Sequence, residues 1–382
     1  KETELDDGSR QYDGVTTIAE GAFTECSSVK ELELPITLTG IDKLAFSKMT
    51  ELETVTIKDN VTYINSEAFR NNVKLREVAI SSDSALDFLG VRAFAGCSEL
   101  TDITLPDKLT EISQYAFYNC SKLDNIKIPE TVQEIGTDAF KGTKEYNDQV
   151  DYNAANGLRN FIFIDRWLVE YTDGKDLTTK ENLPALNATV LGDKLDGKGG
   201  LIGIAQGCFY NCTRLKTVVL PATVRYLGQQ AFSKCSSLET FRTEESSQLI
   251  KIGASCFINN GLKMIYLPSG LKEIGSQAFY GCSSLDYLID DGNGDRTVNR
   301  IPESVEKIGY AAFRKTKIWE DAAKDDGATE GLPKDGVVRI EIVRKSASTG
   351  KQYYWIVDTN TDSGDETAIK ISTVDCGGDN DN

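Results

Sequence analysis

The chain has 382 residues, no histidine, and a formal net charge of −17 from 42 Lys and Arg against 59 Asp and Glu. This charge disfavours nucleic acid and anionic membranes as partners, because both repel an acidic surface. The lack of histidine excludes a Ser-His-Asp or Cys-His catalytic pair and a His-ligated zinc site. We therefore predict no catalytic residue, no metal site and no cofactor.

Residues 1–14 are polar and charged without apolar periodicity, and they are predicted to form a flexible leader. The chain begins at Lys1 rather than Met, and we expect that a signal segment has been removed. No apolar run approaches the roughly 18 residues of a membrane span. The given chain is therefore predicted not to insert into a membrane.

A repeated unit begins at residue 15, and its clearest copy is AFYNCSKLDNIKIPETVQEIG at residues 116–136. The skeleton A-F-x-x-C-x-x-L-x-x-I-x-I-P-x-x-V-x-x-I-G returns, and half of the spacings between its successive phenylalanines are 23 residues. The eleven repeat phenylalanines are Phe23, Phe46, Phe69, Phe94, Phe117, Phe140, Phe209, Phe232, Phe257, Phe279 and Phe313. A period in the twenties that contains L-x-x-I-x-I predicts a leucine-rich solenoid, in which stacked coils bury a shared core.

Each part of the unit has a predicted role. The alternation of Ile126 and Ile128 with polar residues sends the two isoleucines to the inner face of a strand. Pro129 ends that strand, because proline cannot donate to a strand ladder. Phe117 is the largest side chain expected in the core of its coil. Gly136 permits a tight turn before the next coil.

Six cysteines share one place in the repeat, three residues after the phenylalanine. They are Cys26, Cys97, Cys120, Cys212, Cys235 and Cys282, where other units carry Met49, Asn72, Thr143, Asn260 and Thr316. We predict a column of buried thiols, since cysteine packs as a small hydrophobe. Disulfides between neighbours such as Cys97 and Cys120, and metal binding, remain alternatives. Cys208 and Cys256 replace the small Ala before the phenylalanine, and Cys376 in the acidic tail is expected to be exposed.

This repeat pattern resembles the BspA-like leucine-rich repeats of bacterial and protist surface proteins. The resemblance covers residues 15–140 and 202–316. It implies an α/β-type leucine-rich repeat solenoid, with a parallel β-sheet on the concave face and a non-enzymatic binding or adhesion role. It also implies an extracellular or cell-surface location.

The repeat pattern divides the chain into segments. After the leader at 1–14 we predict the first solenoid half at 15–140, degenerate coils with a β-hairpin at 141–201, the second solenoid half at 202–320, a linker at 321–336 and a small antiparallel β element at 337–376. The gap from Phe140 to Phe209 is 69 residues, three times 23, so we expect the stack to keep its phase. An alternative makes 144–200 a ligand-contacting projection. The β element is interpreted as a cap or as a small wall-binding module.

The outward strand positions differ between the halves. In the first half they are nearly all polar, from Glu31 to Lys127. In the second half an apolar patch surrounds one arginine, and the predicted ligand-binding residues are Val219, Arg242, Met264, Tyr266, Tyr287 and Ile289. Such a patch rimmed by charge is typical of a recognition surface. Coverage by residues 320–382 and scattered apolar residues without a role are the alternatives.

Two acidic loops, at 291–295 and 358–362, place Asp and Asn at alternate positions. Both lack the glycine and the closing glutamate of an EF-hand, so Asx turns are favoured over calcium sites.

The resulting functional hypothesis is a secreted or surface-exposed protein that recognises a protein or glycan ligand, a host-derived one included, through the concave sheet of its second half. The alternatives are a structural spacer and, more remotely, a glycan-acting enzyme with paired carboxylates. The sequence leaves the oligomeric state open.

Overall fold

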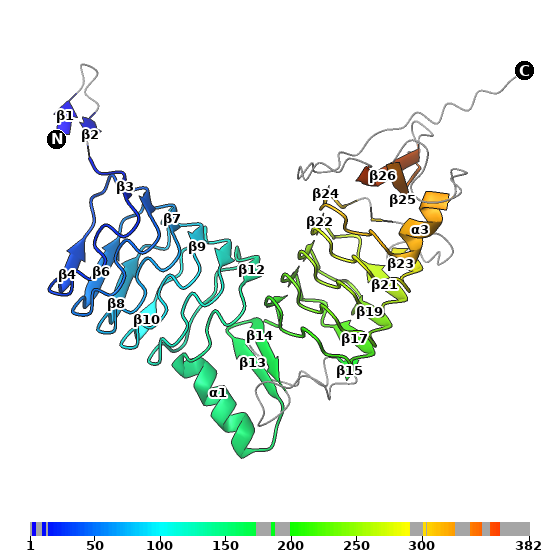
Figure 1. Cartoon of the computed structure of the whole chain (residues 1–382), viewed down its shortest axis with the longest axis horizontal. Coiled ribbons are helices and arrows are strands. Elements are labelled where there is room, and N and C mark those ends of the chain that lie inside the picture. Colours follow the sequence, from blue (N-terminus) through cyan, green and yellow to red (C-terminus); the bar gives the residue numbers. More distant parts are fainter. Residues whose placement is uncertain are drawn as a thin grey trace, which may run out of the picture. The chain divides into compact units, whose positions relative to one another are not determined.

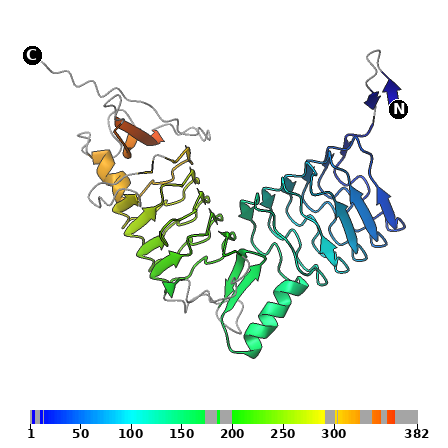
Figure 2. The ribbon, with the colours of Figure 1, turned by 180° about the vertical axis from the view of Figure 1, so that it is seen from behind.

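The computed structural model describes residues 2–4, 10–12, 14–172, 185–187, 199–290, 301–302, 304–324, 337–345 and 352–359. The chain divides into two compact units, unit 1 at Lys1–Lys175 and unit 2 at Asp176–Asn382 (Figures 1 and 2). The boundary falls inside the predicted interruption at 141–201. That the coils keep one phase across this interruption stays a prediction.

Unit 1 is a solenoid whose coils form parallel sheets on two sides (Figure 1). One sheet consists of β4 (Glu31–Glu33), β6 (Thr54–Ile57), β8 (Glu77–Ile80) and β10 (Asp102–Ile103). The other consists of β3 (Thr17–Ile18), β5 (Gly40–Ile41), β7 (Tyr63–Ile64), β9 (Phe88–Leu89), β11 (Glu111–Ile112) and β12 (Glu134–Ile135). Strand order follows chain order in both sheets, as stacked repeats require.

Unit 2 repeats this plan. Its longer strands are β15 (Ala185–Leu186), β17 (Thr217–Leu220), β19 (Thr240–Thr243), β21 (Met264–Leu267) and β23 (Tyr287–Asp290). The shorter strands are β16 (Gly203–Ile204), β18 (Tyr226–Leu227), β20 (Lys251–Ile252), β22 (Glu273–Ile274) and β24 (Lys307–Ile308). The predicted leucine-rich repeat solenoid is thereby confirmed.

The phenylalanines form a continuous ladder within each unit. Successive rings stack with centroids 5.1–5.6 Å apart. Ten of the eleven repeat phenylalanines are at most 1% exposed. Phe23 departs from the expected burial, since it is 43% exposed. It lies in the first coil, where its ring stacks on Phe46 on one side and no earlier repeat phenylalanine exists to stack on the other.

The backbone around each repeat phenylalanine forms a further ladder of hydrogen bonds between coils, which the periodicity of the sequence did not predict. The residues two before and two after the ring have positive φ in every repeat, for example Tyr115 at 59° and Asn119 at 58°. This alternation points the N–H groups of Tyr115, Phe117 and Asn119 at carbonyls of the next coil, at distances of 3.1, 2.7 and 2.9 Å. The turn therefore joins coils by hydrogen bonds as the strands do.

The column three residues after the phenylalanine is a hydrogen-bonding column. Cys97 and Cys120 donate from Sγ to the carbonyls of Phe69 and Phe94, 3.2 and 3.1 Å away. Asn72 and Asn260 donate from Nδ2 to the corresponding carbonyls of Phe46 and Phe232. Cysteine and asparagine interchange at this position because each supplies a side-chain donor to the same carbonyl of the preceding coil, whereas Met49 has no donor there.

The cysteine column is buried except at its start. Cys26 is exposed, contrary to the prediction, because its coil is the first of the stack and its side chain has no preceding phenylalanine carbonyl to contact. Cys97 and Cys120 are free thiols, which argues against a disulfide between them. Burial raises the pKa of Cys97 to about 12, so that thiol stays protonated near neutral pH. Cys376 lies outside the described residues.

Both units end their coils in the same way. Thr143 and Thr316 donate from Oγ1 to the carbonyl of their own repeat phenylalanine, and each precedes a helix. The helices are α1 (Lys144–Ala155) and α3 (Lys317–Lys324). Oγ1 of each threonine also accepts an N–H from the first turn, that of Tyr146 or Trp319. Helix α1 corrects the expectation of degenerate coils directly after residue 140, since the polar run at 144–155 gave no strong apolar period.

A hairpin follows each helix. Strands β13 (Asn160–Ile164) and β14 (Trp167–Thr172) pair antiparallel around Asp165 and Arg166, which confirms the hairpin predicted there. Strands β25 (Val337–Lys345) and β26 (Gln352–Thr359) pair likewise and form the predicted C-terminal β element. At the other end, β1 (Glu2–Glu4) and β2 (Arg10–Tyr12) form an antiparallel pair within the leader that we predicted to be flexible. A backbone pairing of this kind leaves no apolar period in the sequence.

Candidate binding surfaces

The outward face of the longer-strand sheet in unit 2 carries the predicted apolar patch. Register pairs Val219 with Arg242, Met264 with Tyr287 and Tyr266 with Ile289. Tyr287 is 47% exposed and Arg242 is exposed. Val219, Met264 and Tyr266 are half-buried. Strand pairing therefore brings five of the six predicted residues together on a face that reaches solvent.

Ile289 corrects the prediction. Its position in β23 is outward, yet its side chain is only 7% exposed. The alternation of side chains along a strand determines the face of the sheet on which a residue lies. It does not determine whether other atoms cover that residue. We therefore restrict the apolar patch to Val219, Arg242, Met264, Tyr266 and Tyr287.

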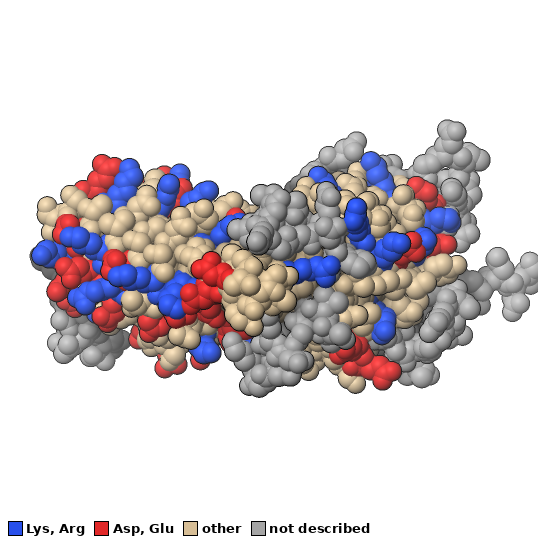
Figure 3. All heavy atoms as spheres, turned by 90° about the horizontal axis from the view of Figure 1, so that it is seen from below, with Lys and Arg blue, Asp and Glu red and all other residues tan. Residues whose placement is uncertain are grey.

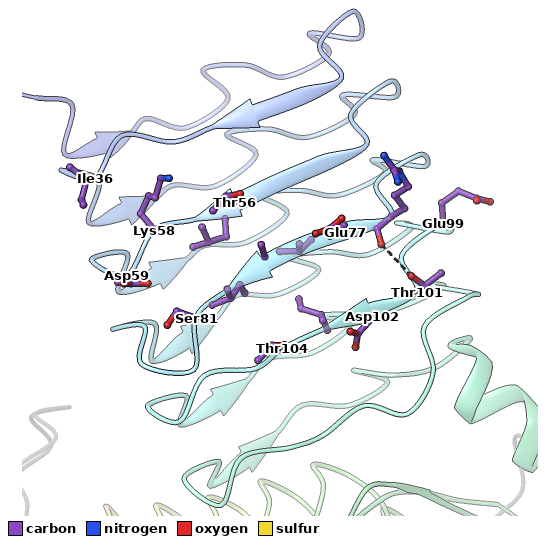
Figure 4. A pocket seen from close by; sticks show the side chains of 16 residues that line it. Ile36, Thr56, Lys58, Asp59, Glu77, Ser81, Glu99, Thr101, Asp102 and Thr104 are labelled. Atoms are coloured by element: carbon purple, nitrogen blue, oxygen red, sulfur yellow. Dashed lines mark hydrogen bonds between the residues drawn. The ribbon is translucent and has the colours of Figure 1, made fainter.

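The corresponding face of unit 1 is polar and hollowed. A hollow of about 820 Å³ lies across β6, β8 and β10 (Figure 4). Its lining residues are Ile36, Thr56, Ile57, Lys58, Asp59, Arg76, Glu77, Val78, Ala79, Ile80, Ser81, Glu99, Thr101, Asp102, Ile103 and Thr104. Strand alternation predicted the polarity of this face but not the hollow, which depends on how side chains from neighbouring coils lie beside one another.

Ion pairs between consecutive coils run along unit 1, where basic and acidic side chains interleave (Figure 3). The pairs include Lys48 with Glu25 at 2.7 Å and Lys74 with Glu51 at 2.8 Å. The bond to Lys48 and the attraction of its charge hold the pKa of Glu25 below its usual value. These pairs are solvent-exposed, so each contributes little to stability.

A buried polar cluster joins the last coil of unit 1 to its helix and hairpin. The Tyr146 hydroxyl donates to Glu170, and Lys141 lies 3.6 Å from Glu170 and 3.3 Å from Asp138. Burial and the charge of Glu170 raise the pKa of Tyr146. Burial by itself lowers the pKa of Lys141, but the carboxylates of Glu170 and Asp138 raise it by more, so the pKa of Lys141 is raised overall. The neutral Tyr146 and the ion-paired Lys141 connect the elements of this cluster. In these states neither side chain is a nucleophile.

Side chains also occupy the edge of the longer-strand sheet in unit 1. Glu145 of α1 accepts the N–H of Ile126 at 3.1 Å, and Asp165 of the hairpin turn accepts the N–H of Ile128 at 3.1 Å. The fifth copy of L-x-x-I-x-I, residues 123–128, forms no strand, and these two carboxylates accept N–H groups of its backbone. Two carboxylates replace the next strand and close this edge.

No metal or membrane site emerges from the described residues. Among them, no group of three or more Cys, Asp or Glu side chains is placed to hold a metal ion. None of the helices described is long and apolar enough to cross a membrane. The loop at 291–295 and most of the loop at 358–362 lie outside the described part of the chain.

Stacked coils with parallel sheets, an aromatic ladder and helix-capped ends define a leucine-rich repeat solenoid. The chain belongs to the family of the BspA type leucine rich repeat region, whose model matches six copies over residues 16–147 and 202–320. A search of curated proteins finds no match.

A search of solved structures matches this chain to proteins from several bacteria. A leucine-rich repeat protein from Bacteroides ovatus is 21% identical, with 82% of each chain covered and a TM-score of 0.26. A leucine rich cell surface protein from Faecalibacterium prausnitzii is 22% identical, with 73% of this chain and 84% of that chain covered and a TM-score of 0.28. The pneumococcal vaccine antigen PcpA is 18% identical, with 83% of this chain and 78% of that chain covered and a TM-score of 0.29.

Proposed function

We propose that this chain is a secreted or cell-surface binding protein that recognises a protein or glycan through the apolar patch of unit 2. The observation that carries the proposal is the alignment of Met264, Tyr266 and Tyr287 on neighbouring strands, with Tyr287 47% exposed. Aromatic and methionine side chains beside an arginine are the residue types enriched at interface cores. The acidic charge of the chain disfavours nucleic acid as a partner.

The test compares the double variant Tyr266→Ala/Tyr287→Ala with the wild type on a glycan array and on a panel of purified extracellular-matrix proteins. Thr217→Ala/Thr240→Ala is a matched control, since both threonines occupy outward positions of the same sheet outside the patch. We expect a ligand that the wild type and the control retain and the tyrosine variant loses. Single buried aromatic anchors typically contribute about 2 kcal/mol or more, which corresponds to at least a 30-fold loss.

Three outcomes would contradict this proposal. Equal binding by the wild type and the tyrosine variant would place the ligand elsewhere. A fall in melting temperature with no change in binding would indicate that the tyrosines pack against another part of the chain. If neither the wild type nor either variant binds any ligand, the structural-spacer hypothesis is favoured.

A further inference from the structure

The hollow on unit 1 owes its shape to small side chains in one row of the sheet. Thr56 and Ala79 are register partners on β6 and β8, and Thr104 directly follows β10. Longer side chains stand around this floor, with Lys58 and Asp59 at the strand exits and Glu99 on the opposite side (Figure 4). The hollow is therefore a shallow trough across several coils, with a volume of about 820 Å³.

The charges in this trough are not balanced. Glu77 and Asp102 are exposed and directly opposite each other on β8 and β10. Like charges in that arrangement repel and weaken a sheet. Among the described residues neither carboxylate has a basic partner, because the nearby Arg76 and Lys58 contact Glu53 and Glu33 at 3.3 and 3.7 Å.

We infer that the trough binds a Lys- or Arg-bearing extended segment of a protein partner. An ammonium or guanidinium group placed between Glu77 and Asp102 removes their repulsion and forms charge-assisted hydrogen bonds with both. The hydroxyls of Thr56, Thr104 and Ser81 line the same trough and can bond to peptide groups. This second site differs from the apolar patch in position and chemistry, so it does not depend on the function proposed above.

Other ligand classes fit the trough less well. An anionic ligand would meet two unpaired carboxylates. An apolar ligand would cover the threonine hydroxyls of the floor without bonding to them. A metal ion would find two carboxylates where hard cations take six or more oxygens.

The test uses the full chain and a fluorescently labelled octa-arginine peptide, with binding measured by fluorescence anisotropy at low and physiological salt. The test variant is Glu77→Gln/Asp102→Asn. The control is Glu244→Gln/Glu245→Gln, which removes the same number of charges from exposed positions of unit 2. We expect the test variant to bind about tenfold more weakly and the control to stay within about twofold of the wild type.

Three results would overturn the inference. The first is that octa-arginine does not bind the wild type. The second is that both variants weaken binding equally, which would mean attraction to the overall charge. Displacement of the peptide by calcium at a concentration of about 1 mM would indicate an ion site. Thermal melting monitors folding, and the test variant should melt no lower than the wild type because a repulsion has been removed. The Tyr266→Ala/Tyr287→Ala variant should still bind octa-arginine, which separates this site from the apolar patch.

Discussion

At the scale of single residues, the repeat positions have distinct physical roles. The phenylalanine supplies buried area and ring stacking, and a cysteine or asparagine three places later supplies a hydrogen-bond donor to the preceding coil. The sequence revealed both columns, since each recurs in register. It predicted burial for the cysteine column but not the bond that makes Asn72 equivalent to Cys97, because that bond joins residues of different coils.

Phe117→Ala is expected to lower the free energy of unfolding by about 3–5 kcal/mol, because the ring is fully buried between Phe94 and Phe140. Urea denaturation measures this change. Phe23→Ala is the matched control, and it should cost clearly less because Phe23 is 43% exposed. Equal losses for the two variants would contradict the assigned burial.

The thiols should differ sharply in reactivity. At pH 8 a thiol reagent is expected to label the exposed Cys26 and to leave Cys97 unlabelled until the protein is denatured, as mass spectrometry of labelled peptides would show.

The raised pKa of Cys97 also makes the stability of the protein depend on pH. Below pH 9 the thiol of Cys97 is protonated in both states, whereas between about 9 and 12 it ionises only when unfolded. Its contribution to stability is therefore lost as the pH rises through this window, and a Cys97→Ala variant should show a shallower alkaline decline. Native labelling of Cys97 would contradict this account.

At the scale of elements, each unit is a stack closed by a helix and followed by a hairpin. In unit 1 the closure is specific, because Gln149 of α1 pairs with both the N–H and the carbonyl of Phe163 in β13. Glu145 and Asp165 complete it at the sheet edge. The sequence predicted the hairpin from its alternation of β-rich residues, but the polar helix before it had no comparable signal.

Glu145→Ala is expected to lower the free energy of unfolding by about 1–2 kcal/mol, since it leaves the N–H of Ile126 without its carboxylate acceptor. Amide hydrogen exchange at Ile126 should accelerate at the same time. Lys144→Ala is the neighbouring control, because Lys144 is exposed and forms surface ion pairs with Asp124 and Asp148. Unchanged exchange at Ile126 would show that the carboxylate does not close the edge.

At the scale of the whole molecule, charge acts in two opposing ways. Ion pairs between coils, such as Lys122 with Glu99 at 2.6 Å, favour stacking, while the net charge of −17 repels itself. The pairs are exposed and each contributes about 0–1 kcal/mol. The surplus of acidic residues extends over the whole chain, so its repulsion should prevail at low ionic strength.

We therefore expect the melting temperature to rise when sodium chloride increases from roughly 10 to 150 mM, because the screening length falls from about 30 to 8 Å. Differential scanning calorimetry measures the shift, and glucose at matched osmolality controls for general solute effects. A fall in melting temperature would mean that the ion pairs between coils outweigh the net repulsion.

The sequence by itself determined the coil, its period and the direction of each strand residue, because a solenoid repeats the same local geometry and side chains alternate across a strand. It also named most of the apolar patch, since register follows from the repeat. Only the tertiary structure decided which outward positions stay accessible, as Ile289 shows, and where small floor residues leave a trough between longer neighbours. Accessibility and hollows depend on atoms from several coils at once, and no single repeat encodes them.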